Sequence, residues 1–193
     1  MELLLIRHGL PEHVATDDGS PADPPLSATG HLQASQVADW LERHHIDALY
    51  SSPMQRALQT AAPLSSAKGL DIQVRDGVAE YDRHAGEYIP VEKLKEQDYE
   101  RWKLLMKSEF SDVDFKLFYD EVVDTIEAII TANGGKTVAI TCHGGVINAW
   151  TAHILGLGPK MFFNPNYTSI NRYMAASSGE RSIVTLNQHV HLD

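Results

Sequence analysis

Residues 5–9, Leu-Ile-Arg-His-Gly, place a permanent cation and a titratable ring directly after an apolar run. That run, residues 3–6, has the composition of a buried strand. Neither a guanidinium nor an imidazole is needed for packing at the end of such a strand. Arginine's planar fork matches phosphate oxygens, and a neutral imidazole nitrogen can act as a nucleophile. Arg7 and His8 are therefore the first candidates for chemistry, beside a bound anion.

Two further apolar runs lead into residues of the same kinds. Residues 47–51 run into a helix that carries Arg56 in its first turn, and residues 138–141 precede Cys-His-Gly-Gly, which contains His143 and Gly144. In an open parallel sheet, binding sites form beyond the carboxyl ends of the strands. If the three strands run in one direction, their polar groups converge on one site. Gly144 leaves room there for the backbone to approach a ligand.

The elements that must position these residues alternate along the chain, which predicts an α/β fold. We expect a three-layer α/β/α sandwich with a mixed, mainly parallel sheet. Ser52-Pro53 is predicted to open a helix as N-cap and first residue, and Pro63 to kink or end it. The other predicted elements are helices at 34–41, near 91–107, at 115–132 and at 145–155, a strand at 72–74, and a hairpin around 177–179.

Composition limits the classes of function. The chain has 193 residues, which fits one domain over 1–193, with an excursion at about 76–112 that covers the site. The net charge of −10 disfavours nucleic acid and anionic membranes as partners. No apolar run is long enough to span a bilayer, and we expect no signal peptide. The single cysteine, Cys142, excludes a disulfide within the chain and suits a cytoplasmic location.

Four stretches together resemble the histidine phosphatase superfamily, in the branch that includes cofactor-dependent phosphoglycerate mutases and many small bacterial phosphatases. The stretches are LLLIRHG (3–9), LSATGHLQA (26–34), LYSSPMQRALQTAAPL (49–64) and VAITCHGGVI (138–147). The tail also resembles the phosphatase members, whereas residues 76–130 match least.

The resemblance implies a role for each matching residue. His8 corresponds to the nucleophilic histidine that takes up the phosphoryl group. Arg7, Arg56 and His143 correspond to the side chains that hold the phosphoryl oxygens. Glu80 is the counterpart of the acidic proton donor, with Asp82 as the alternative donor.

We therefore expect an enzyme that hydrolyses a small phosphomonoester through a phosphohistidine on His8, with no metal or other cofactor. A phosphoglycerate mutase-type transfer is one alternative, and a non-catalytic member that binds phosphorylated ligands is another. Val14 stands where mutases carry asparagine, and Leu10-Pro11 where they carry Glu-Ser, which favours the phosphatase. The sequence leaves the oligomeric state open, a homodimer included.

Other features have simpler interpretations. Gly135-Lys136-Thr137 lacks the spacing of a P-loop and indicates a helix-to-strand turn. His44-His45 and the pair His189 and His191 are weak metal candidates, and Cys142 is expected in the core. Several loop residues are candidates for substrate specificity: Glu12, His13, Tyr81, Arg83, His84, Tyr88 and Trp102.

Overall fold

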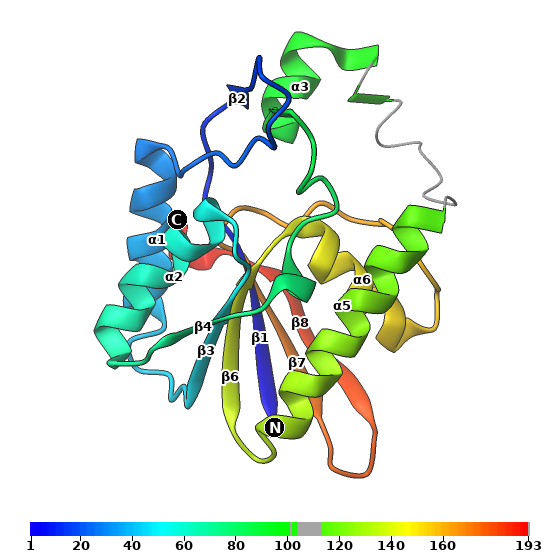
Figure 1. Ribbon diagram of the computed structural model, residues 1–193. Coiled ribbons are helices and arrows are strands. Elements are labelled where there is room, and N and C mark those ends of the chain that lie inside the picture. Colours follow the sequence, from blue (N-terminus) through cyan, green and yellow to red (C-terminus); the bar gives the residue numbers. More distant parts are fainter. Residues whose placement is uncertain (101, 104–112, 193) are drawn as a thin grey trace.

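A six-stranded sheet runs through the middle of the protein, in the order β4-β3-β6-β1-β7-β8 (Figure 1). The structure, a computed structural model, describes residues 1–100, 102–103 and 113–192. β4, β3, β6 and β1 are mutually parallel, and β7 and β8 add an antiparallel edge. The prediction of a mixed, mainly parallel sheet is confirmed. The strands are β1 Glu2–Arg7, β3 Ala48–Ser51, β4 Ile72–Val74, β6 Thr137–Cys142, β7 Ile170–Ala175 and β8 Arg181–Gln188.

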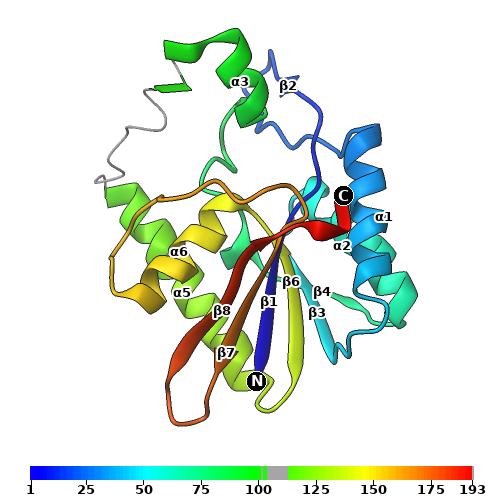
Figure 2. The same ribbon diagram turned by 180° about the vertical axis from the view of Figure 1, so that it is seen from behind.

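Helices cover both faces of the sheet, which Figures 1 and 2 show from opposite sides. α1 (Ala28–Trp40) and α2 (Gln55–Lys68) pack on one face, and α5 (Val113–Ala132) and α6 (Gly144–Leu155) on the other. Strand side chains alternate between faces. Leu3 and Leu5 of β1 belong to the α5/α6 core, whereas Leu4 and Ile6 belong to the α1/α2 core. Burial on both faces explains why β1 is a continuous apolar run.

Shorter elements lie beyond the carboxyl ends of the parallel strands, at the top of Figure 1. β2 (Val14–Ala15) pairs with β5 (Glu87–Tyr88), and α3 spans Val91–Gln97. The remaining short elements are the 3-10 helices η1 (Asp76–Val78) and η2 (Val190–Leu192). The helix predicted near 91–107 is thus shorter than expected: Asp98 ends it, residues 99–100 and 102–103 are again helical, and 104–107 lie outside the described residues.

The predicted start of α2 is wrong, and of the two effects predicted for Pro63, an end to the helix is excluded. The helix begins at Gln55, with Met54 as N-cap, because the Asp23 carboxylate from a distant loop accepts from the Gln55 amide at 3.0 Å. Pro63 does not end the helix, which continues to Lys68. A mid-helix proline loses one backbone hydrogen bond. Buried Ala61 and Leu64 on either side of it hold the helix against the sheet.

Candidate active site

Three parallel strands deliver the predicted residues to one edge of the sheet. β1 ends at Arg7 and is followed by His8, and β6 ends at Cys142 and is followed by His143. Arg7 lies in register with Cys142, so the two histidines are adjacent, with ring centroids 5.1 Å apart. β3 ends beside them and leads through Ser52 towards Arg56 in α2. The predicted convergence of these strand ends is present in the structure.

His8 is held in a single tautomer. It is 2% exposed, and its Nδ1 lies 2.8 Å from the carbonyl oxygen of Gly9. A carbonyl can only accept, so Nδ1 carries the proton and Nε2 keeps its lone pair. Burial, followed by the charges of Arg56 and Arg7, holds the pKa of His8 well below its usual value. The ring is therefore a neutral base with one nitrogen available for attack.

Two buried guanidinium groups supply the positive charge. Arg56 is fully buried, and within the described part of the chain none of its guanidinium nitrogens has a hydrogen-bond partner. Among the described residues, its charge is met by Asp82 at 3.5 Å, by Asp23 at 4.0 Å and by the ring of Tyr88, whose centroid lies 4.5 Å from Cζ. Arg7 donates through Nη1 to the Pro165 carbonyl and stacks on Tyr167, with Cζ 4.0 Å from the ring centroid. Cations buried with so few partners suit the binding of a multivalent anion.

His143 is oriented by a residue whose role the sequence did not reveal. Its Nε2 lies 2.7 Å from Ser52 Oγ, which also accepts from the Met54 amide at 3.2 Å. No other described group accepts from the Ser52 hydroxyl, so its proton is directed to Nε2, which leaves the proton of His143 on Nδ1. Nδ1 is buried and has no partner among the described residues. Burial and Arg56 lower the pKa of His143, so this ring is also neutral.

Glu80, which follows η1 in the chain, is bonded to the start of α6. Its Oε2 accepts from the Gly145 amide at 3.0 Å, and its Oε1 from the Tyr81 amide at 3.0 Å. Burial and the nearby charge of Asp82 raise the pKa of Glu80, against the effect of these two hydrogen bonds. Asp82 faces Arg56 instead. Burial raises the pKa of Asp82 too, but there the charge of Arg56 acts in the opposite direction, whereas the neighbouring anion of Asp82 favours the proton of Glu80.

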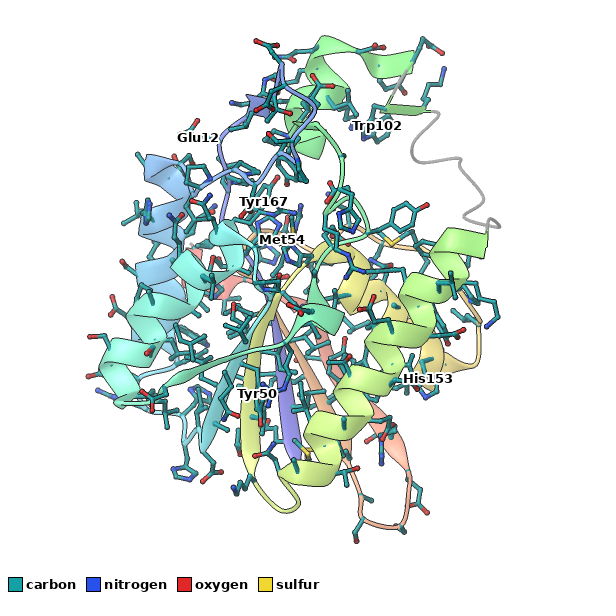
Figure 3. All side chains as sticks on the ribbon, in the orientation of Figure 1. Glu12, Tyr50, Met54, Trp102, His153 and Tyr167 are labelled. Carbon is teal, nitrogen blue, oxygen red and sulfur yellow. The ribbon has the colours of Figure 1, made fainter. Side chains whose placement is uncertain are left out.

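Arg7, His8, Arg56, Glu80 and Asp82 line a pocket of about 350 Å³, whereas His143, which is fully buried, does not line it. Its polar lining comes from Arg7, His8, Arg56, Glu80, Asp82 and Asn164, and most of the other lining residues apart from Gly144 and Gly145 are apolar or aromatic. In Figure 3, Tyr167 and Met54 lie near the end of the sheet at which the parallel strands terminate, whereas Tyr50 lies lower on the sheet. A second hollow, of about 370 Å³, is lined by residues of α5 with Tyr50 and Arg75, and none of the predicted site residues reaches it.

Sequence reasoning missed much of the pocket wall. Met161, Phe162 and Phe163 line it, as does Phe115 from α5. Ordinary apolar residues carry no chemical signature, so no motif could have indicated them. A signal did exist for Asn148, a polar residue on the buried face of α6, which bonds to the backbone of residues 162 and 163.

The remaining candidates are dispersed. Tyr81 and Tyr88 line the pocket, but Glu12, His13, Arg83, His84 and Trp102 do not. Arg83 instead pairs with Glu121 at 3.1 Å, and His13 lies 3.6 Å from Glu87. Cys142 is buried as predicted, and burial raises the pKa of its thiol. Among the described residues there is no cluster suited to a metal, and no described helix has the length and apolarity to cross a membrane.

Comparisons with known proteins agree with the fold. Residues 3–189 match the family described as histidine phosphatase superfamily (branch 1). Phosphoserine phosphatase 1 from Hydrogenobacter thermophilus is 30% identical over 176 residues, which cover 85% of this chain and 81% of that protein. The uncharacterized phosphatase PhoE of Bacillus subtilis is 26% identical over 159 residues, 81% of this chain and 79% of that protein.

A solved structure extends this likeness to the whole chain. A mutant of phosphoserine phosphatase from Entamoeba histolytica, in complex with phosphoserine, superposes with a TM-score of 0.76 at 23% identity, covering 100% of this chain and 99% of that one. The prediction of an enzyme of the phosphoric monoester hydrolase class is confirmed by the family match. The chain belongs to the histidine phosphatase superfamily, branch 1.

Proposed function

We propose that this protein hydrolyses a small phosphomonoester in two steps through a phosphohistidine on His8. The observation that carries the proposal is the tautomer of His8, whose Nδ1 is bonded to the Gly9 carbonyl while two buried arginines stand beside its ring. A neutral nucleophile next to fixed cations is what phosphoryl transfer requires, because this reaction depends mainly on positioning and charge stabilisation.

In the first step, His8 Nε2 attacks phosphorus and the bond from phosphorus to the ester oxygen breaks. Arg7, Arg56 and the Nδ1 proton of His143 hold the phosphoryl oxygens. A unit charge pair about 4 Å apart at an effective dielectric constant of about 20 is worth about 4 kcal/mol before desolvation. Glu80 gives its proton to the departing oxygen, which leaves as a neutral alcohol. The raised pKa of Glu80 keeps that proton available at higher pH than in an ordinary carboxyl.

In the second step, water attacks the phosphohistidine. Glu80, now a carboxylate, takes a proton from the water as the new bond to phosphorus forms and the bond to Nε2 breaks. Inorganic phosphate leaves, and both His8 and Glu80 return to their starting protonation states. The same five side chains therefore serve both steps, and no step needs a metal.

The experiment that tests the proposal compares hydrolysis of p-nitrophenyl phosphate by the wild type, His8→Ala and His45→Ala. His45 is 81% exposed and lies outside the pocket, so it is the matched control. We expect His8→Ala to lose at least about 10³-fold in kcat/KM and His45→Ala to keep wild-type activity. Equal turnover by His8→Ala and the wild type would rule the mechanism out.

The products formed from 3-phosphoglycerate distinguish this proposal from the mutase alternative. A phosphatase releases inorganic phosphate from 3-phosphoglycerate or from a better ester, whereas a mutase converts 3-phosphoglycerate into its isomer. Isomer formation faster than phosphate release would favour the mutase. Binding of phosphate esters without hydrolysis of any would favour the non-catalytic alternative.

A further inference from the structure

The pocket beyond the phosphoryl end has an unusual surface for a phosphate-ester site. Its wall is made of large apolar and aromatic side chains from three separate segments of the chain. These are Tyr81, Tyr88, Ile89, Phe115, Met161, Phe162 and Phe163. The alcohol part of a bound ester must lie against this wall, because the phosphoryl group occupies the end with Arg7, His8 and Arg56.

Among the described lining residues there is no third cation for a second anionic group, and Asn164 and the two tyrosines are only neutral hydrogen-bond donors. Arg7 and Arg56 are the only arginine or lysine residues among the described residues that line the pocket. A phosphomonoester dianion alone matches their two charges. The other ionisable groups are His8, which is neutral, Glu80, which the proposed mechanism keeps protonated, Asp82, whose charge repels a carboxylate, and the weakly acidic Tyr81 and Tyr88. Arg83, which follows Asp82 in the chain, is paired with Glu121.

One part of the apolar wall, the segment of Phe162 and Phe163, is bonded to α6. Asn148, fully buried in α6, accepts through Oδ1 from the amides of Phe162 and Phe163 at 2.9 and 3.2 Å. Its Nδ2 donates to the carbonyls of Gly144 and Phe163 at 2.8 and 2.9 Å. The rings of Phe162 and Phe163 are 5.1 Å apart. These bonds connect Phe162 and Phe163 to the helix whose first residues, Gly144 and Gly145, line the same pocket.

We infer that the preferred substrate is a monoester of an uncharged, largely apolar alcohol, with an aromatic or bulky hydrocarbon group, and that a second carboxylate on the ester is disfavoured. The inference rests on the proposed function and names the substrate class for the same site. It differs from the substrate in the name of the Hydrogenobacter relative, since phosphoserine carries a carboxylate and an amine next to its phosphoryl group.

The test compares 2-phenylethyl phosphate with 3-phosphoglycerate. Both esters release a primary alcohol, so the comparison removes the advantage that a phenolic leaving group would give. We expect kcat/KM for 2-phenylethyl phosphate to be higher by about tenfold or more, from burial of the phenyl ring and the absence of carboxylate repulsion. Equal values, or a preference for 3-phosphoglycerate, would overturn the inference.

A substitution in the apolar wall tests whether this wall causes the preference for 2-phenylethyl phosphate. Phe162 is 37% exposed, so Phe162→Ala should fold normally. We expect it to lower kcat/KM for 2-phenylethyl phosphate by about three- to tenfold, and for 3-phosphoglycerate by no more than about twofold. Val184→Ala, which truncates a half-exposed residue of β8 outside the pocket, should change neither. Equal losses on both esters in Phe162→Ala would show that the wall does not select the alcohol.

A binding measurement distinguishes failure of this inference from failure of the proposed function. Titration calorimetry of His8→Ala with the same two esters measures the preference without hydrolysis. Tighter binding of 2-phenylethyl phosphate supports the inference even if no ester is hydrolysed by the wild type, a result that would overturn the proposed function alone. Tighter binding of 3-phosphoglycerate overturns the inference even if hydrolysis proceeds through His8.

Discussion

At the scale of single residues, the site depends on how each neutral ring and each carboxyl is kept in its protonation state. The Gly9 carbonyl and the Ser52 hydroxyl set the tautomers of His8 and His143. Asp82 acts on Glu80 through charge, without a hydrogen bond to it among those described. The residues that tune the site are therefore distinct from those that would contact the phosphoryl group, and they can be tested separately.

Asp82→Asn should shift the alkaline limb of the pH profile of kcat/KM to lower pH. The negative charge of Asp82 is one cause of the raised pKa of Glu80, so its removal lets Glu80 lose its proton earlier as pH rises. A pH series with p-nitrophenyl phosphate measures the shift, with Asp18→Asn in an exposed loop as control. An alkaline limb that stays in place, or moves upward, would contradict the assignment of Glu80 as proton donor.

Ser52→Ala should lower kcat/KM by about five- to thirtyfold, the equivalent of one lost hydrogen bond in a buried network. Without the hydroxyl, the tautomer of His143 is no longer fixed. Its Nδ1 then does not always carry the proton that would be donated to a phosphoryl oxygen. Affinity for vanadate should fall in parallel, and His8 should still be phosphorylated. Unchanged vanadate affinity in a well-folded Ser52→Ala protein would show that Ser52 does not position His143.

At the scale of elements, the start of α6 and the segment that carries Glu80 are fitted to each other. A Cβ on Gly145 would lie 2.1 Å from Glu80 Oε1 and 3.2 Å from Phe118. Gly134, between α5 and β6, has no atom within 4 Å of the corresponding position. Neither glycine has a positive φ. The two positions thus differ in the space that surrounds them and not in backbone strain.

Gly145→Ala should therefore reduce kcat by about 100-fold, because the displaced Glu80 carboxyl no longer reaches the leaving oxygen. The unfolding temperature should change little, since only the end of one flexible side chain must move and alanine favours a helix by about 1 kcal/mol over glycine. Gly134→Ala should keep wild-type kcat. Wild-type kcat in Gly145→Ala would contradict the proposed position of the donor.

The elements that the sequence predicted well are those with a strong local pattern. The parallel strands read as continuous apolar runs, and α5 shows an apolar face at helical spacing, so both were placed closely. The start of α2 was misplaced, because its cap comes from Asp23, 32 residues away in the chain. A local reading cannot find a cap that only tertiary structure supplies.

The candidate site likewise contains some residues that could be predicted from a local pattern and others that could not. Arg7 ends a strand, and His8 and His143 each follow one, so their convergence could be predicted from the rule for parallel sheets. Glu80 was predicted as a site residue from the resemblance alone, and its hydrogen bond with the Gly145 amide is visible only in the folded chain. The apolar wall was not predictable, since Phe115 and Phe162 are far apart in the sequence and look like any other core or surface residues.

At the scale of the whole molecule, burial of neutral histidines links the site to stability. The pKa values of His8 and His143 are lowered in the folded protein, mainly by burial. Below about pH 6.5, the unfolded chain therefore binds protons that the folded protein does not, so the unfolded state gains stability. Glu80 has the opposite effect, because its raised pKa favours the folded state at lower pH.

In phosphate-free buffer, the free energy of unfolding should fall more steeply with acidification in the wild type than in His8→Asn. The expected difference is at most about 1.4 kcal/mol per pH unit below pH 6.5. Urea unfolding between pH 5 and 7.5 measures both slopes. The contribution of Glu80 is shared by the two proteins, so their difference isolates His8. Identical slopes would show that His8 takes up a proton as readily in the folded state as in the unfolded state.

The central claim is tested most directly by trapping the covalent intermediate. Wild-type protein is mixed with a phosphomonoester that carries a radioactive phosphoryl group, quenched in base within milliseconds, and digested for peptide mapping. A label that survives base, is lost in acid and lies on the peptide containing His8 is the predicted result, and His8→Ala should carry none. Turnover by the wild type with no label, or with the label on another residue, would contradict the account.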